Sequence, residues 1–105
     1  MGRKKHLTYL NEFKEELGRF TPISKMILFG SRAHGKNSRW SDFDLVIVSP
    51  TFRKKKFRDR AVGFYKYWNL DYPVDFLCYT PEEFQHLKKR ITVVKEAVET
   101  GIEIK

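Results

Sequence analysis

The sequence predicts a single domain of the α/β (α+β) class, residues 1–105, in which helices flank a small mixed β-sheet. Short apolar runs occur at 25–29, 42–48 and 74–79, and their length and composition are typical of buried strands. Apolar residues at helical spacing occupy the stretches between and around these runs. A chain of 105 residues has room for one modest hydrophobic core, and no internal repeat or linker divides it.

The first predicted helix covers residues 8–17 and ends near Gly18. Its apolar residues, three and four positions apart, are Leu10, Phe13 and Leu17. The strand at 25–29 follows, and a loop at 32–40 has room for one helical turn. The second strand ends at Ser49-Pro50, because proline cannot continue a β-ladder.

Two further helical regions are predicted in the second half of the chain. Residues 53–69 have a helical pattern of large apolar side chains. Thr80, Pro81 and Glu83 match an N-cap, a proline at the first helical position and the acid of a capping box. The apolar stripe after them continues to Val98, as one helix or as two broken near Arg90. Residues 102–104 are predicted as a short edge strand.

The chain is basic, with a net charge of +8, and its cations gather at the N-terminus, at 53–60 and at 88–90. This charge either keeps solvated faces soluble or attracts a nucleotide, RNA or an acidic partner. Aromatic residues make up 15% of the chain, so part of them could form an exposed partner-binding patch rather than core. The candidates for that patch are Phe57, Phe64, Tyr65, Tyr67, Trp68, Tyr72 and Phe84.

The sequence favours a cytoplasmic location. No apolar run is long enough to cross a membrane, and the basic N-terminus lacks the apolar region of a signal peptide. Cys78 is the only cysteine, so no intrachain disulfide can form, and its apolar surroundings predict a buried thiol.

The most informative segment begins with Gly30-Ser31, directly after the first strand. Glycine can adopt positive φ and lets a phosphate approach the backbone closely. The Ser31 hydroxyl adds a donor, and a helical turn beginning there would add backbone N–H groups. A Gly-Ser pair alone is weak evidence, because most such pairs are simple turns.

Asp42 and Asp44 open the second strand at alternate positions, so their side chains would share one face. Aspartate is disfavoured in strands, and two together repel each other. A divalent cation such as Mg²⁺, which takes carboxylate and phosphate oxygens, would relieve that repulsion. The plainer alternative is a turn residue followed by a solvent-facing acid.

Asp75 is a third carboxylate, inside an otherwise apolar strand. If its strand lies beside the second one, Asp75 could reach the face that carries Asp42 and Asp44. Three carboxylates around two cations would allow two-metal phosphoryl or nucleotidyl transfer. Arg32, His34 and Lys36 could contact phosphates from the intervening loop or be solvated. No His/Cys cluster with the spacing of a zinc site occurs.

The pattern Gly-Ser-x-Ala-x-Gly, five residues, then Ser-Asp-x-Asp-Leu, at residues 30–45, resembles the signature of the DNA polymerase β-like nucleotidyltransferase superfamily. The small size is similar to its minimal nucleotidyltransferase (MNT) domains, and the resemblance spans essentially the whole chain. It implies a mixed sheet with flanking helices, Mg²⁺ (two ions) and ATP as substrate. His34 is a departure, because the family pattern has arginine there, which binds two phosphate oxygens at once.

The resemblance also implies roles for individual residues. Asp42, Asp44 and Asp75 match the family's catalytic and metal-binding carboxylates. Gly30 and Ser31 match residues that engage the triphosphate, and Ser41 joins them as a nucleotide-binding position.

The resemblance further implies a partner. MNT domains of this type are similar to antitoxins of HEPN/MNT toxin–antitoxin modules, which transfer AMP from ATP to a tyrosine hydroxyl of a HEPN-domain ribonuclease toxin. We therefore expect a protein adenylyltransferase that acts on such a partner. The alternatives are a non-catalytic antitoxin that masks its partner sterically, and nucleotidyl transfer to RNA or a small molecule.

Overall fold

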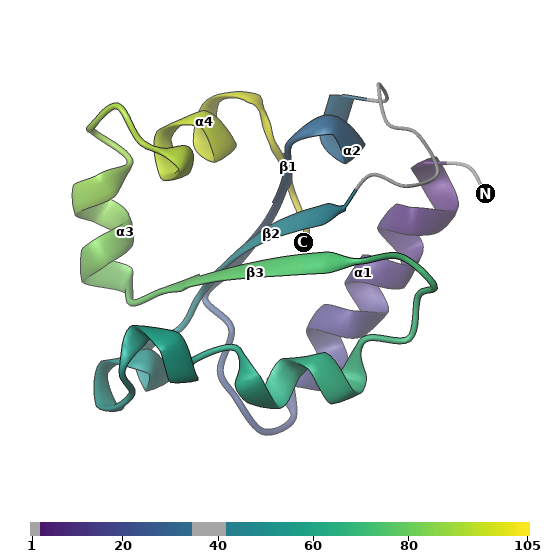
Figure 1. Cartoon of the computed structure of the whole chain (residues 1–105), viewed down its shortest axis with the longest axis horizontal. Coiled ribbons are helices and arrows are strands. Elements are labelled where there is room, and N and C mark those ends of the chain that lie inside the picture. Colours follow the sequence, from purple (N-terminus) through teal and green to yellow (C-terminus); the bar gives the residue numbers. More distant parts are fainter. Residues whose placement is uncertain (1–2, 35–41) are drawn as a thin grey trace.

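A computed structural model describes residues 3–34 and 42–105 and has a four-stranded mixed sheet at its centre (Figure 1). The strand order is β3-β2-β1-β4, in which β2 runs parallel to β3 and β1 runs antiparallel to both β2 and β4. The strands are β1 (Lys25–Phe29), β2 (Phe43–Val48), β3 (Val74–Tyr79) and β4 (Ile102–Glu103). The predicted α+β class and the three main strands are confirmed.

Helices cover both faces of the sheet. The α-helices are α1 (Arg3–Gly18), α2 (Ser31–His34), α3 (Pro81–Leu87) and α4 (Val93–Thr100). Side chains of α1 pack on one face of the sheet with Leu45 and Ile47, and side chains of α3 and α4 pack on the other with Val46 and Val48. Alternate residues of β2 thus serve two separate cores, as the period of a strand requires.

The predicted helix over 53–69 is wrong. Three short 3-10 helices take its place, η1 (Pro50–Lys54), η2 (Phe57–Asp59) and η3 (Val62–Tyr67). Lys55 has extended backbone at φ −125°, which ends η1. Phe52 and Phe64 both enter the α1-side core, and packing these two rings from a broken segment overrides the helical periodicity of the sequence.

The capping box before α3 is present as predicted. The Thr80 hydroxyl accepts a hydrogen bond from the Glu83 N–H, and the Glu83 carboxylate accepts one from the Thr80 N–H. The apolar stripe that follows the capping box belongs to two helices, α3 and α4, rather than to one. They are separate because the Thr92 hydroxyl caps the start of α4 by accepting a hydrogen bond from the Lys95 N–H. A threonine N-cap satisfies a backbone donor that a continuous helix would bond internally.

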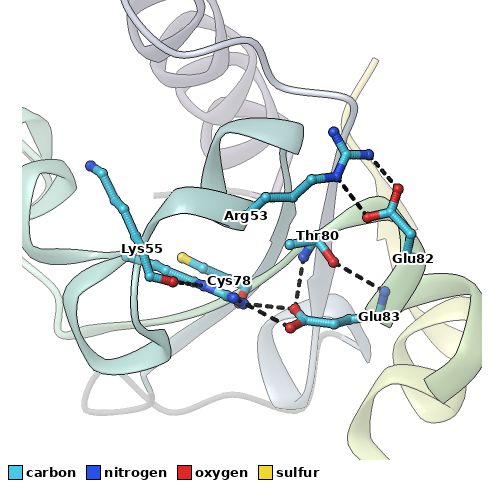
Figure 2. Close-up of polar contacts among 7 residues, drawn as sticks. Arg53, Lys55, Cys78, Thr80, Glu82 and Glu83 are labelled. Carbon is cyan, nitrogen blue, oxygen red and sulfur yellow. Dashed lines mark hydrogen bonds and ion pairs between the residues drawn. The ribbon is translucent and has the colours of Figure 1, made fainter.

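Arg60 links the 3-10 region to the start of α3. Its guanidinium donates to the Lys55 and Cys78 carbonyls and to the Glu83 carboxylate, at N–O distances between 2.6 and 3.3 Å. These bonds from Arg60 are the main reason why the pKa of Glu83 is lowered. Figure 2 shows this network beside the exposed pair formed by Arg53 and Glu82. Arg60 therefore fixes the backbone of η1 and η2 against β3.

The aromatic surplus divides between core and surface. Phe64 and Phe84 are buried, whereas the side chains of Phe57 and Tyr65 are about half exposed, at 54% and 50%.

The Cys78 thiol is buried as predicted, and its desolvation raises the pKa of this thiol to about 12. Within the described residues, no helix combines the length and the apolar character that a membrane crossing demands.

His6 of α1 gives the fold a predicted pH dependence. Its ring packs edge-on against Phe43 and Tyr72, and its buried Nε2 is the one buried side-chain N or O atom without a hydrogen-bond partner among the described residues. Burial, and then the nearby Arg32 charge, lower the pKa of His6 in the folded protein.

Protonation of His6 therefore favours the unfolded chain. We expect the free energy of unfolding to be highest above the unfolded pKa of about 6.5 and to fall as the pH drops below it. The slope from this one proton is at most about 1.4 kcal/mol per pH unit. Urea unfolding between about pH 8 and pH 5.5 checks this, with His6→Phe as the non-titrating control that keeps the ring packing. Identical slopes for the two proteins would refute the assignment.

Candidate active site

The register of the sheet brings two of the predicted carboxylates side by side. Asp44 of β2 pairs with Asp75 of β3 in the parallel ladder, and with Phe29 of β1 on its other side. Directly paired residues of adjacent strands point to the same face. Asp44 and Asp75 therefore lie on the sheet face that α3 and α4 partly cover, at the end of the sheet where β1 runs into Gly30.

Gly30 meets Asp44 at close range. Its φ is +77°, the left-handed conformation that side chains rarely adopt, and a Cβ placed on it would lie 2.6 Å from Oδ2 of Asp44. The Asp44 carboxylate thus lies against bare backbone. Gly30 thus uses the backbone freedom that the sequence offers at this position, and the helical turn for which the loop has room is α2, which begins at the next residue, Ser31.

The electrostatics of the site centre on Asp44. Its pKa is raised, first because the carboxylate is desolvated, and then because Asp75, Asp42 and Glu96 place negative charge near it. Such a site favours either a proton or a cation on Asp44. A phosphate-bound divalent cation would meet that demand without loss of the carboxylate charge.

Glu96 was not predicted from the sequence. It is an exposed acid in the first turn of α4, and nothing in the pattern distinguishes it from Glu99 on the same helix. Packing of α4 against β1 brings its charge within electrostatic range of Asp44.

The donor set at this end of the sheet fits a hard cation such as Mg²⁺, because carboxylate oxygens are the ligands such ions prefer. Asp42 is exposed and lies one residue before β2. Across 3–34 and 42–105, no three His, Cys, Asp or Glu side chains stand close enough together to form a metal site by themselves. Mg²⁺ commonly takes one or two carboxylates and completes its shell with water and substrate phosphates. The metal-binding and catalytic roles of Asp42, Asp44 and Asp75 stay predictions.

The phosphate-contacting residues expected from the loop divide into three cases. Ser41 and Lys36 lie outside the described residues. His34 ends α2 and is exposed. Arg32 is buried, and its guanidinium lies 4.7 Å from the Phe43 ring centroid and 4.4 Å from that of Tyr72. Phe43 belongs to the α1-side core, so Arg32 stacks away from the carboxylate face.

Comparisons with known proteins identify the family and the fold. A family described as "Nucleotidyltransferase domain" matches residues 10–99. A Haemophilus influenzae protein named as the protein adenylyltransferase MntA is 32% identical over 92 residues, which cover 86% of this chain and 81% of that protein. A crystal structure of a candidate nucleotidyltransferase from Sulfolobus solfataricus has the same fold, with a TM-score of 0.65 and 24% identity, covering 82% of this chain and 77% of that one.

The family match spans the Gly-Ser turn, the paired aspartate strands and the helices that flank them. The relative matches most of its own length and most of this chain. The chain therefore belongs to the nucleotidyltransferase domain family, as a domain of the minimal MNT type, and it is a nucleotidyltransferase.

Proposed function

We propose that this nucleotidyltransferase transfers AMP from ATP to a hydroxyl group of a partner protein. The observation that carries the proposal is the position of Asp44 between Gly30, whose missing side chain leaves room for the carboxylate, and Asp75, which pairs with it across the ladder. The printed name of the Haemophilus relative, a protein adenylyltransferase, supports a protein as the acceptor.

In the proposed reaction the acceptor oxygen attacks the α-phosphorus of ATP. The new O–P bond forms while the bond from that phosphorus to the bridging oxygen of pyrophosphate breaks, and pyrophosphate leaves. The acceptor proton passes to the carboxylate of Asp75, whose exposed side chain can be reached by an incoming hydroxyl. Gly30 and Ser31 hold the β- and γ-phosphates through the backbone and the hydroxyl.

Mg²⁺, expected as two ions, would be held by Asp42, Asp44 and Asp75, and would offset phosphate charge and lower the pKa of the acceptor hydroxyl. Asp44 is the central ligand in this scheme, because the negative charges of Asp75, Asp42 and Glu96 all act on its carboxylate. Glu96 adds negative charge at the rim of the site and so strengthens its preference for cations over a bare triphosphate.

The proposed acceptor is a tyrosine hydroxyl of a HEPN-domain ribonuclease, which the transfer would silence, so that this chain acts as its antitoxin. Support comes from the family resemblance and from apolar side chains on the carboxylate face of the fold. α4, the helix that carries Glu96, leaves Val93 and Val98 nearly half exposed, and Ile91 just before it is 98% exposed. Exposed apolar groups on a helix that packs over the same sheet face as the carboxylates suit a protein partner.

The test is to incubate the purified chain with Mg²⁺, ATP and the partner protein encoded beside it, and to measure the intact mass of both chains. We expect the partner to gain whole AMP units, and Asp75→Asn to reduce that gain at least about a hundredfold. Asp71→Asn, an exposed acid in the loop before β3, is the matched control and should leave the gain unchanged.

Two other results would contradict the proposal. A partner that is neutralised with no change in mass would indicate steric masking. Labelled AMP recovered on RNA or on a small molecule, and not on protein, would indicate a different acceptor.

A further inference from the structure

A strongly basic hollow lies at the opposite end of the sheet from the carboxylates. It has a volume of about 500 Å³ and is lined by Lys54, Lys55, Lys56, Asp59, Val62 and Gly63. This basic hollow follows the end of β2, whereas Asp44 lies at the beginning of that strand. The strand between residues 44 and 48 alone spans about 13 Å. The hollow is therefore no part of the triphosphate site described above.

The backbone that carries these lysines is held in place. The fully buried Ser49 caps η1 by accepting from the Thr51 N–H, and the ring of Phe52 enters the core. On the other side, Arg60 donates to the Lys55 carbonyl while it also bonds Glu83. Figure 2 shows the Lys55 side chain extending away from Glu82 and Glu83. The lysines are thus presented from a fixed scaffold, which lowers the entropy cost of binding a ligand.

The charge of the basic hollow is not balanced by neighbouring acids. Two cations of the segment have carboxylate partners, since Arg53 pairs with Glu82 and Arg60 with Glu83. Among the described residues, none of the three lysines has a carboxylate within ion-pair distance. Asp59 is the one acid that lines the hollow. A polyanion would gain from three exposed ammonium groups held next to one another.

The side chains around the lysines suit a nucleic acid better than a protein. Lysine is depleted in protein–protein interfaces, whereas it is a standard partner of phosphate groups. The same segment leaves Phe57, Val62 and Tyr65 exposed by half or more. Exposed aromatic and apolar surface beside a positive groove is the arrangement that stacks unpaired bases. Asp59 would repel a phosphate, but its carboxylate can accept a hydrogen bond from a ribose 2′-hydroxyl.

We propose that the basic hollow binds single-stranded RNA. Its three lysines neutralise phosphates, the neighbouring exposed rings support unpaired bases, and Asp59 favours ribose over deoxyribose. The hollow and the carboxylates are at opposite ends of the sheet. The RNA segment bound in the hollow therefore lies away from the carboxylates and does not become the acceptor of AMP.

The experiment measures fluorescence anisotropy of a labelled single-stranded RNA of about twelve nucleotides, over a salt series. We compare the wild type with the triple variant Lys54→Glu, Lys55→Glu, Lys56→Glu. The matched control is Lys4→Glu, Lys5→Glu, Lys89→Glu, which makes the same charge change at exposed positions elsewhere. We expect the hollow variant to lose about tenfold or more in affinity at about 100 mM salt, and its log–log salt slope to fall by about 2. The control should change less than about threefold.

Further arms of the experiment separate RNA from other ligands and from catalysis. DNA of the same sequence should bind about threefold or more weakly than the RNA, and Asp59→Ala should abolish that difference. Asp44→Asn should bind RNA like the wild type, so failure of the adenylyltransferase proposal and failure of this one are distinguishable. Equal losses in the two triple variants would overturn the proposal, because binding would then reflect net charge alone. If polyglutamate displaced the RNA as readily as polyuridylate does, the hollow would bind polyanions of any kind, and the choice of RNA would be overturned.

Discussion

Replacing Asp44 with asparagine should reduce AMP transfer by about a hundredfold to a thousandfold while leaving the fold intact or slightly more stable. The substitution removes the negative charge on which the proposed metal ligation depends. The same charge is costly in the fold, because burial and the acids around it raise the pKa of Asp44. At neutral pH the asparagine variant avoids that cost. Opposite directions for activity and stability are the expected signature of a functional carboxylate.

The measurement pairs the initial rate of AMP transfer to the partner with the midpoint of urea unfolding. Asp71→Asn, which removes an exposed acid from the loop before β3, serves again as the control and should change neither quantity by much. An Asp44→Asn protein that retains most of its transfer rate would exclude this residue from the metal site. If the Asp44→Asn protein instead lost several kcal/mol of its free energy of unfolding, the carboxylate would have a structural role.

Gly30→Ala should be nearly as damaging to transfer, by a different physical route. The φ of +77° costs an alanine about 1 to 2 kcal/mol, and its Cβ would lie 2.6 Å from Oδ2 of Asp44. The carboxylate or the turn must therefore move by several tenths of an ångström or more. Displacement of a catalytic group on the scale of 1 Å costs about a hundredfold in rate. We expect a loss of about that size together with the modest destabilisation.

Gly18→Ala is the matched control for Gly30→Ala. Gly18 ends α1, has no positive φ, and a Cβ placed on it would meet nothing within 4 Å. We expect unchanged transfer and a change in stability of less than about 1 kcal/mol. Both variants are compared by transfer rate and thermal unfolding. If Gly30→Ala transferred AMP at the rate of Gly18→Ala, the close approach between Gly30 and Asp44 would have no part in catalysis.

The three main strands and the capping box could be predicted because strong local signals coincide with their tertiary environment. The strands at Lys25–Phe29 and Val74–Tyr79 lie where their apolar content places them, and the capping box at Thr80 forms as its spacing predicts. The adjacency of Asp44 and Asp75 depended on one further condition, that β3 pairs with β2, which the structure satisfies. The signal in the sequence that identified Asp75 as a site candidate was a charged residue in an otherwise apolar strand.

The remaining features were decided by contacts between segments distant in the sequence. The region after β2 is a series of 3-10 helices because Phe52, Arg60 and Phe64 are each fixed by partners on other elements. Arg32 stacks on Phe43 and Tyr72, and no local pattern anticipates that placement.

By itself, the sequence determined the class of the fold, the order of its strands along the chain, and the identity of the family through one turn and three aspartates. Those are properties of local periodicity and of residue types at short spacing. Only the tertiary structure decided that Asp44 lies against Gly30, that Glu96 adds its charge to the site, and that three lysines form a hollow at the far end of the sheet. Electrostatic and steric effects act through space, so they depend on which elements pack together rather than on their distance along the chain.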